Sequence, residues 1–182
     1  MVSGPSGVGK DTVIRRLFEL APELSYSVSY TTRQPRPGEV DGRDYSFVSD
    51  AEFDRMVEGG DLLEWEPVHS HRSGTGRSRV EEALDAGRDI VLNIDVKGGV
   101  RVRQLLHDAL LAFLAPPSVE ELNRRRRDRG TEDEDELARR ASDAEIEMGY
   151  SGQYDAVVVN DDVDRAAKEI LDLIQQRRGN RA

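Results

Sequence analysis

The chain has 182 residues, of which 37% are hydrophobic and 34% charged, and its formal net charge at pH 7 is −10. This length suits one compact domain with a sizeable core, and the acidic balance argues against broad nucleic-acid binding, which requires a basic face. No run of about 18 apolar residues is present, so we expect no membrane span, no signal peptide and a cytoplasmic location. The absence of cysteine excludes disulfides, thiolate metal sites and cysteine catalysis.

The first motif is a glycine-rich loop, Gly4-Pro-Ser-Gly-Val-Gly9-Lys10, directly after Val2-Ser3. It fits the phosphate-binding pattern G-x-x-x-x-G-K, in which curled backbone N–H groups and a helix N-terminus face the phosphates and the lysine supplies an ammonium group. Apolar residues at helical spacing follow and predict a helix over about residues 10–19. A simple strand-to-helix turn is the less favoured alternative. The expected contacts to nucleotide phosphates are Gly4, Pro5, Ser6, Gly7, Val8, Gly9, Lys10, Asp11 and Thr12.

Two features of this loop are irregular. Asp11 stands where the pattern has Ser or Thr, and Thr12 follows one residue later. A carboxylate is a hard oxygen ligand, so Asp11 is a candidate Mg²⁺ ligand, with Thr12 as the alternative. Asp11 also places negative charge near the phosphates. In addition, only residues 1–3 precede the loop, whereas a strand usually has about five or six residues, so we expect the native start to lie upstream.

Between the loop helix and residue 87, short β-like segments alternate with turns and two short helices. The expected elements are a strand at 24–30, a polar loop at 31–44, a strand at 45–48, a helix opened by a capping box at 49–52 and closed at 59–60, a strand at 62–68, a loop at 69–77 and a helix from about 78 to 87. In the last helix Val80, Ala83 and Leu84 are expected to face inward.

The second half reads as buried strands alternating with helices. The expected elements are a strand at 90–94 ending in Asp95, a helix to about 107, a strand at 109–114, charged helical residues 119–148 opened by a second capping box and broken at Gly130, a strand at 156–159 and a helix that starts near Asn160. This alternation predicts an α/β fold, a parallel sheet with helices on both faces. Ligands of such sheets lie at the carboxyl ends of strands, where the glycine-rich loop, Asp95 and Asn160 are expected.

A second motif decides the family. The segment Ser27–Val48, SVSYTTRQPRPGEVDGRDYSFV, combined with the loop, closely resembles guanylate kinase, which transfers the γ-phosphoryl group of ATP to GMP or dGMP. The resemblance continues through Glu64-Trp65, Gly74-Thr75, Ile94-Asp95 with Gly98, Arg129-Gly130-Thr131 and Asn160-Asp161-Asp162. It implies a P-loop nucleoside monophosphate kinase fold in a single domain. The implied parts are a core of residues 1–28, 81–123 and 144–182, a small GMP-binding region at 29–80 and a helical lid at 124–143.

The resemblance also implies a GMP site. Arg33 and Arg36, with the Tyr45 hydroxyl, would grip the phosphate dianion, although without the motif the two arginines would be read as solvated. Glu64 and Asp95 match the family's guanine readers, because carboxylates accept from the adjacent N1–H and N2 amine of guanine and adenine offers neither. Asp95 also reads as a helix N-cap. Ser29 and Thr75 match the hydroxyl groups that complete base recognition.

The segment before Gly74 departs from the family pattern. The family usually has a tyrosine there that helps to hold the GMP phosphate, and this chain has Ser73. A serine hydroxyl donates a hydrogen bond but reaches less far. Arg72 and Arg77 are weak candidates to replace the missing tyrosine contact. Binding of the GMP phosphate is therefore the least complete part of the implied site.

In the lid region, Arg125, Arg129 and Arg140 match arginines that close over the ATP phosphates, and Asn160 matches a contact near the adenine. Catalysis would then rest on alignment and charge neutralisation by Lys10, Arg33, these three arginines and Mg²⁺. The expected ligands are ATP, Mg²⁺ and GMP or dGMP, with no nucleic acid or membrane, in a monomer or homodimer. We read all three histidines as non-catalytic.

Two other functions stay open. Ribose 1,5-bisphosphate phosphokinases are related, and their loop also runs Gly-Lys-Asp, as at Gly9-Lys10-Asp11. Against that substrate stand the segment from Thr31 to Tyr45 and Glu64, which suit a guanine nucleotide. A non-catalytic guanylate-kinase-like module that binds protein is the other alternative, but such a module would be expected to lose the loop lysine and glycines.

Overall fold

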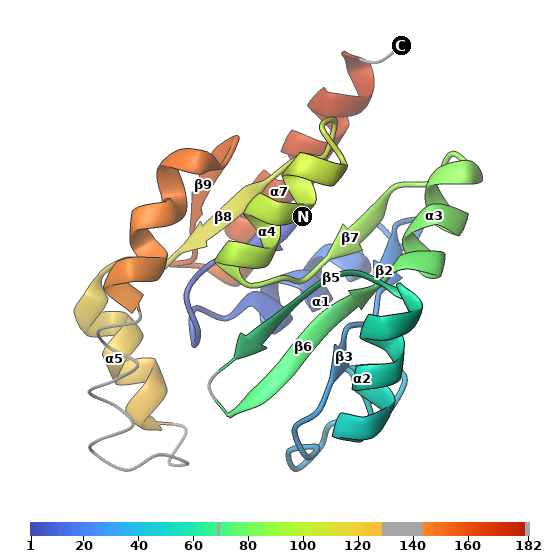
Figure 1. Ribbon diagram of the computed structural model, residues 1–182. Coiled ribbons are helices and arrows are strands. Elements are labelled where there is room, and N and C mark those ends of the chain that lie inside the picture. The colour runs from blue at the N-terminus through green and yellow to red at the C-terminus, as the bar shows by residue number, and fades with distance from the viewer. Residues whose placement is uncertain (69, 129–143, 181–182) are drawn as a thin grey trace. The chain divides into compact units, whose positions relative to one another are not determined.

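The computed structural model describes residues 1–68, 70–128 and 144–180. The chain divides into two compact units, one formed by Met1–Pro22 with Asp108–Ala182 and the other by Glu23–His107 (Figure 1). The glycine-rich loop and Asn160 belong to the first unit. The segment from Ser29 to Asp95, which holds the residues expected to bind GMP, belongs to the second.

The first unit is built on a three-stranded parallel sheet in the order β1-β8-β9. Its strands are β1 (Val2–Ser3), β8 (Ala112–Ala115) and β9 (Ala156–Val159). All four residues of the central strand β8 are buried, which explains its unbroken apolar sequence.

The helices of the first unit begin where the sequence indicates. Helix α1 (Lys10–Leu20) packs against α7 (Val163–Gly179), and α5 (Val119–Asp128) follows β8. Residues 144–148 are helical and continue into a 3₁₀ turn, Gly149–Gln153. Asp162 caps α7 by accepting a hydrogen bond from the backbone N of Arg165 at 2.8 Å.

The second unit contains a two-stranded parallel sheet and a four-stranded mixed sheet. In the first, β2 (Ser25–Ser27) pairs with β7 (Ile90–Leu92). The second has the order β4-β3-β6-β5, with strands β4 (Ser46–Phe47), β3 (Tyr30–Thr31), β6 (His71–Gly76) and β5 (Leu62–Val68). Strands β5 and β6 form an antiparallel hairpin, visible in green in Figure 1.

Three helices complete the second unit: α2 (Asp50–Gly59), α3 (Arg77–Asp85) and α4 (Val96–Leu105). The predicted capping box at the start of α2 is confirmed, because Ser49 accepts from the backbone N of Glu52 and Glu52 accepts in return from Ser49. Gly60 closes this helix with a φ of 71°, a left-handed conformation that glycine adopts without a steric penalty.

Several predicted elements need correction. Residues 71–76, expected as a loop, form β6, because pairing with β5 stabilises a strand whose own sequence lacks apolar alternation. The predicted strand over 24–30 divides into β2 and β3, which belong to different sheets. Leu84, expected to face inward, is 46% exposed. The strands expected in one parallel sheet are hydrogen-bonded as two, β1-β8-β9 in the first unit and β2-β7 in the second, and β1 offers only two residues for pairing.

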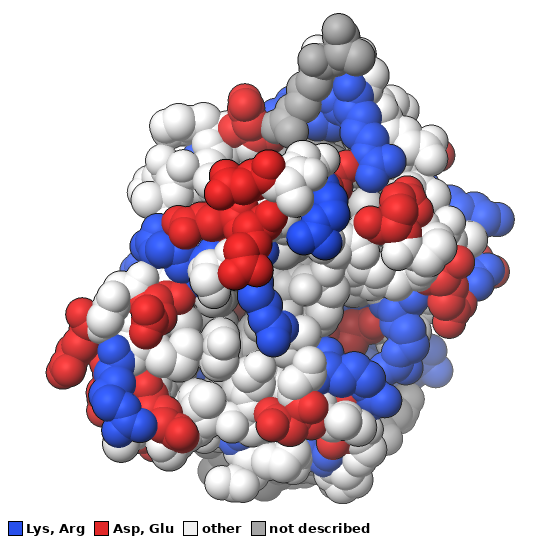
Figure 2. Space-filling model, turned by 90° about the vertical axis from the view of Figure 1, so that its right-hand side faces the viewer, with Lys and Arg blue, Asp and Glu red and all other residues white. Residues whose placement is uncertain are grey.

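The surface carries both signs of charge. On the face drawn in Figure 2, acidic and basic side chains are interspersed, as expected for a chain with 26 basic and 36 acidic residues. Within residues 1–68, 70–128 and 144–180, every helix is too short or too polar to span a bilayer.

Candidate nucleotide-binding sites

The glycine-rich loop is tightly folded over the end of β8. Gly4, Gly7 and Gly9 have φ values of 151°, 87° and 99°. A Cβ atom on Gly4 would lie 2.2 Å from the carbonyl oxygen of Leu114, so no larger residue fits there. The loop therefore favours glycine at all three positions for its conformation, and at Gly4 also for lack of space.

The Lys10 side chain folds back over this loop. Its Nζ donates to the carbonyl oxygen of Gly4 at 2.7 Å and lies 3.4 Å from that of Pro5. The loop carbonyls thus hold the ammonium group beside the backbone N–H groups, and a phosphate in the loop would meet both.

Asn160 and Arg125 join this loop at Val8. Asn160 is 3% exposed and donates from Nδ2 to the carbonyl oxygen of Val8 at 2.8 Å. Arg125 reaches the same oxygen at 3.3 Å and the carbonyl oxygen of Asn160 at 3.1 Å. The structure therefore brings together a predicted adenine contact, a predicted lid arginine and the phosphate loop.

Arg125 is also fixed within its own helix. Its Nε donates to Oε1 of Glu121 at 2.8 Å, and Arg124 contacts the same carboxylate. Hydrogen bonds from Arg124 and Arg125 lower the pKa of Glu121 to about 2. This carboxylate is therefore ionised at neutral pH and keeps Arg125 oriented.

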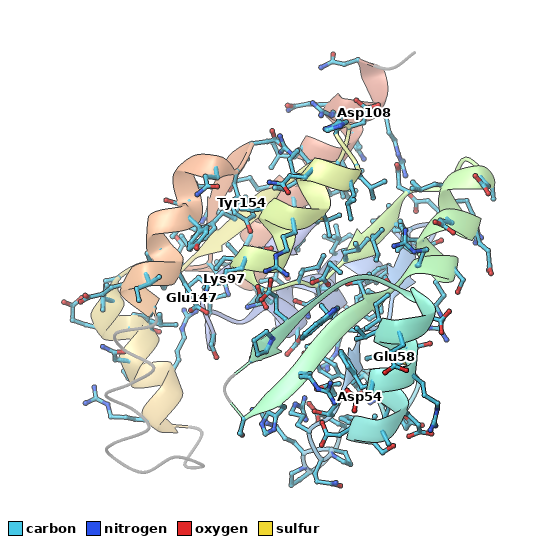
Figure 3. The ribbon with its side chains drawn as sticks, viewed as in Figure 1. Asp54, Glu58, Lys97, Asp108, Glu147 and Tyr154 are labelled. Atoms are coloured by element: carbon cyan, nitrogen blue, oxygen red, sulfur yellow. The ribbon has the colours of Figure 1, made fainter. Side chains whose placement is uncertain are left out.

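One carboxylate at the loop was not expected from the sequence. Glu147, labelled in Figure 3, accepts a hydrogen bond from the backbone N of Ser6 at 3.2 Å. Loops of this kind bind anions through backbone N–H groups, and a carboxylate is such an anion. Glu147 lies near the end of the charged segment 119–148 and belongs to no motif, so nothing in the sequence marked it.

The candidate Mg²⁺ ligand Asp11 lies in the first turn of α1 and is exposed, as is Thr12. Among the described residues, no group of three histidine, aspartate or glutamate side chains is arranged to hold a metal ion. Mg²⁺ in nucleotide sites typically takes one or two protein oxygens and completes its shell with phosphates and water, so a single carboxylate fits that role. Arg129 and Arg140, the other predicted lid arginines, lie outside the described residues.

In the second unit, Glu64 and Thr75 face each other across the β5–β6 hairpin. The hydroxyl of Thr75 donates to Oε1 of Glu64 at 2.6 Å, and Glu64 is only 9% exposed. Its other oxygen lies against the start of α4, where a Cβ on Gly98 would come within 2.7 Å of Oε2. Gly98 therefore makes room for the carboxyl group.

The pKa of Glu64 is raised to about 7, mainly by burial and to a smaller extent by the charges of Asp95 and Glu66. The Thr75 hydrogen bond and the charge of Arg101 act in the opposite direction. A carboxyl group with this pKa gains or loses its proton near neutral pH. A ligand can therefore change its charge by supplying or removing hydrogen-bond donors.

Asp95 caps α4, as the sequence indicated. Its Oδ1 accepts from the backbone N atoms of Lys97 and Gly98, both at 2.9 Å. Ser29 lies 3.4 Å from the carbonyl oxygen of Asn93, on the segment that leads to Asp95. The residues expected to read guanine thus come from β5, β6, the start of α4 and the residue before β3.

Arg33, which is expected to bind the GMP phosphate, lies against two aromatic rings and a carboxylate. Its guanidinium group lies 4.7 Å from the centroid of the Tyr45 ring and 5.4 Å from that of Phe47. Glu39, which was not predicted, receives two hydrogen bonds from Arg33, at 2.6 and 2.7 Å, and one from the backbone N of Arg36 at 2.7 Å. The hydrogen bonds from Arg33 hold the pKa of Glu39 below its usual value.

The two weak candidates for extra phosphate contacts have structural partners. Arg72 pairs with Asp50 at 2.9 Å and Asp54 at 2.5 Å, and its guanidinium lies 4.8 Å from the Phe53 ring centroid. Arg77 donates to the carbonyl oxygens of Gly60 and Leu62. Ser73 donates to the carbonyl oxygen of Tyr30 at 3.2 Å. These contacts fasten β6 and α3 to their neighbours.

Comparisons with known proteins agree with this arrangement. The guanylate kinase family model matches residues 1–177. The chain is 51% identical over 172 residues to a guanylate kinase of Nocardia farcinica, covering 93% of this chain and 89% of that protein. It is 45% identical over 174 residues to a guanylate kinase of Caldanaerobacter subterraneus, covering 96% and 84% respectively.

A solved structure, that of guanylate kinase from Anaplasma phagocytophilum, matches with a TM-score of 0.81 at 31% identity, covering 97% of this chain and 84% of that chain. This match confirms the predicted α/β fold of a P-loop nucleoside monophosphate kinase. Together with the family model and the two sequence relatives, it shows that the chain belongs to the guanylate kinase family.

Proposed function

We propose that the protein transfers the γ-phosphoryl group of ATP to GMP or dGMP, producing ADP and GDP or dGDP, as a step of purine nucleotide metabolism in the cytoplasm. The reaction class follows from family membership. The choice of base rests on one local observation, the buried Glu64 carboxyl group that Thr75 holds at 2.6 Å.

Glu64 and Asp95 are the guanine readers in this proposal. Guanine presents N1–H and an exocyclic amine side by side, and carboxylate oxygens accept both hydrogen bonds. Adenine would place an acceptor nitrogen against the buried Glu64. An unpaired buried polar group costs roughly 1–3 kcal/mol, and more when it is charged, so GMP is strongly preferred over AMP. Ser29 and Thr75 orient this part of the site.

Arg33, Arg36 and Tyr45 bind the GMP phosphate. The Arg33 guanidinium is already oriented by Glu39 on one edge and by the Tyr45 ring on its face. An oriented guanidinium binds a phosphate dianion with less loss of side-chain entropy. Arg36 sits in the same turn through its backbone contact to Glu39.

On the ATP side, residues Gly4 to Thr12 hold the phosphates and Lys10 neutralises charge on the β- and γ-phosphates. Asn160 and Arg125 support the loop at Val8, and we assign them to the adenine and to the ATP phosphates respectively. Mg²⁺ supplies further positive charge on the phosphate oxygens, with Asp11 as its candidate protein ligand.

Catalysis rests on alignment and charge neutralisation. The GMP phosphate attacks the γ-phosphorus in line, and the developing charge is stabilised by Lys10, Arg33 and Arg125, with Arg129 and Arg140 closing from the lid. We assign GMP binding to residues 29–80 and the lid to residues 124–143, within a single domain that acts as a monomer or homodimer.

The test is ADP formation from ATP and Mg²⁺, with GMP, dGMP, AMP, dTMP or ribose 1,5-bisphosphate offered separately. Activity with GMP and dGMP alone is the expected result. Activity with ribose 1,5-bisphosphate alone would replace the proposed acceptor, and a folded protein without any transferase activity would instead support a protein-binding role.

A further inference from the structure

The face of β5 that carries Glu64 carries a second buried acid. Glu66 lies two residues further along the strand, so both side chains leave the same side of the sheet. Glu66 is 7% exposed, even less than Glu64. A buried carboxylate needs a positive partner or a proton, because its transfer from water is otherwise very costly.

That partner comes from α4, which packs against β5. The NH1 atom of Arg101 lies 2.7 Å from Oε1 of Glu66, and the same atom lies 3.4 Å from the carbonyl oxygen of Trp65. The Arg101 side chain is 60% exposed and that of Glu66 is 9% exposed. Arg101 therefore brings a solvated positive charge to the edge of the buried acidic face.

Burial and four neighbouring residues act on the charge of Glu64. Burial and the negative charges of Asp95 and Glu66 favour the protonated form, whereas the Thr75 hydrogen bond and the positive charge of Arg101 favour the ionised form. Glu66 and Arg101 thus act on Glu64 in opposite directions while they contact each other. Because opposite charges in contact largely cancel at a third site, removing either one alone exposes the effect of the other.

We propose that Glu66 and Arg101 are a positioning pair for base recognition, which sets how readily Glu64 offers an ionised carboxylate to the N1–H and N2 amine of guanine. The inference rests on the proposed function, in which Glu64 reads guanine. Neither Glu66 nor Arg101 contacts the base in this scheme, and both act through Glu64. A protonated Glu64 would present one donor where guanine also presents donors, so the charge of Glu64 controls the fit.

The direct test observes Glu64 without any nucleotide. Carbon-13 NMR of glutamate side-chain carboxyl groups gives the titration midpoint of Glu64 in the full chain and in Glu66→Gln, Arg101→Gln and the double variant. Glu66→Gln should move the midpoint to lower pH and Arg101→Gln to higher pH, each by roughly half a unit or more. The double variant should return close to the wild-type value.

Lys97→Gln is the matched control. Lys97, labelled in Figure 3, is exposed on the same helix as Arg101, and its substitution removes the same charge. Its charge is not among the main influences on the pKa of Glu64, so the midpoint should stay close to the wild-type value. A purely structural role of the pair would not move the two single variants in opposite directions.

The functional readout is the KM for GMP against pH at saturating ATP. At pH 6.5, Glu66→Gln should lower this KM and Arg101→Gln should raise it, each by roughly threefold, with kcat nearly unchanged. A titration midpoint that stays fixed in either single variant, or moves in the same direction in both, would overturn the inference. Loss of the proposed function is distinguishable, because wild-type protein would then fail to phosphorylate GMP while the NMR midpoints could still move.

Discussion

The hydroxyl of Thr75 lies 2.6 Å from Oε1 of Glu64, on facing strands of the β5–β6 hairpin. Both residues are buried, and the hydrogen bond favours the ionised form of Glu64 by direct donation. Thr75 therefore supports the charge that guanine recognition requires and also fixes the carboxyl group in place.

Thr75→Val removes this hydrogen bond and keeps the side-chain shape. The pKa of Glu64 should rise further above its present value of about 7, and the KM for GMP at pH 7 should increase by roughly tenfold or more. Thr75→Ser, which retains a hydroxyl group, is the control and should stay near wild type. Steady-state kinetics at fixed ATP measures the effect, and equal KM values in the two variants would contradict it.

Glu64→Gln should stabilise the ligand-free protein while it impairs substrate choice. The pKa of Glu64 is raised from 4.5 to about 7, so the folded state binds a proton more tightly than the unfolded state. The stability of the wild type should therefore fall as pH rises from about 4.5 through 7, by about 3 kcal/mol for a shift of this size. The Glu64→Gln variant has no carboxyl group at this position, so it should not lose stability in this way as pH rises.

Thermal unfolding of both proteins at pH 5 and pH 8 measures the difference. The midpoint of the variant relative to wild type should be higher at pH 8 than at pH 5 by several degrees. GMP kinetics should show a higher KM and weaker discrimination against other nucleoside monophosphates, as also expected for Glu64→Ala. A constant difference in midpoint between the two pH values would show that Glu64 does not titrate in this range.

The sequence predicted the parts of the sites that are carried by local motifs. The glycine-rich loop, the capping box at Ser49 and the N-cap Asp95 each depend on a few neighbouring residues, so their chemistry could be read directly. Glu64 and Thr75 were expected in the same site through the family resemblance. Their direct hydrogen bond, by contrast, depends on hairpin register.

The residues that were missed gain their roles from tertiary pairing. Strand β6 has glycine and polar residues where a strand usually alternates, and pairing with its neighbours β5 and β3 gives it a strand conformation. Glu39 and Glu147 are acids in polar segments, where most charges are simply solvated, and nothing in the pattern marks their contacts to Arg33 and Ser6. Glu66 was likewise unmarked, because its burial and its contact to Arg101 depend on α4.

Lys10→Ala should abolish phosphoryl transfer without unfolding the protein. Its ammonium group lies over the loop, 2.7 Å from the carbonyl oxygen of Gly4. Within residues 4–12, all of which the structure describes, Lys10 is the one lysine. We expect kcat to fall by roughly 10³-fold or more. Lys168→Ala, at an exposed position of α7, is the control and should retain activity. Retained transfer in Lys10→Ala would exclude the loop as the ATP phosphate site.

Glu39→Gln tests whether Glu39 orients Arg33 for the GMP phosphate. Both oxygens of Glu39 accept from Arg33, and the lowered pKa of Glu39 keeps it ionised across any neutral assay. Replacing one acceptor oxygen with an amide donor should turn the guanidinium away, so we expect the KM for GMP to rise by roughly tenfold. The KM for ATP should change little, since the contacts of Glu39 are to Arg33 and Arg36, which are assigned to the GMP phosphate.

A double-mutant cycle with Arg33→Ala separates this role from a direct effect of the charge. If Glu39 acts through Arg33, adding Glu39→Gln to Arg33→Ala should cause little further increase in the KM for GMP. If Glu39 instead opposes phosphate binding by repulsion, Glu39→Gln should lower the KM in both backgrounds, because the negative charge is lost in each. The two mechanisms thus predict opposite signs in the wild-type background, and one set of kinetic measurements decides between them.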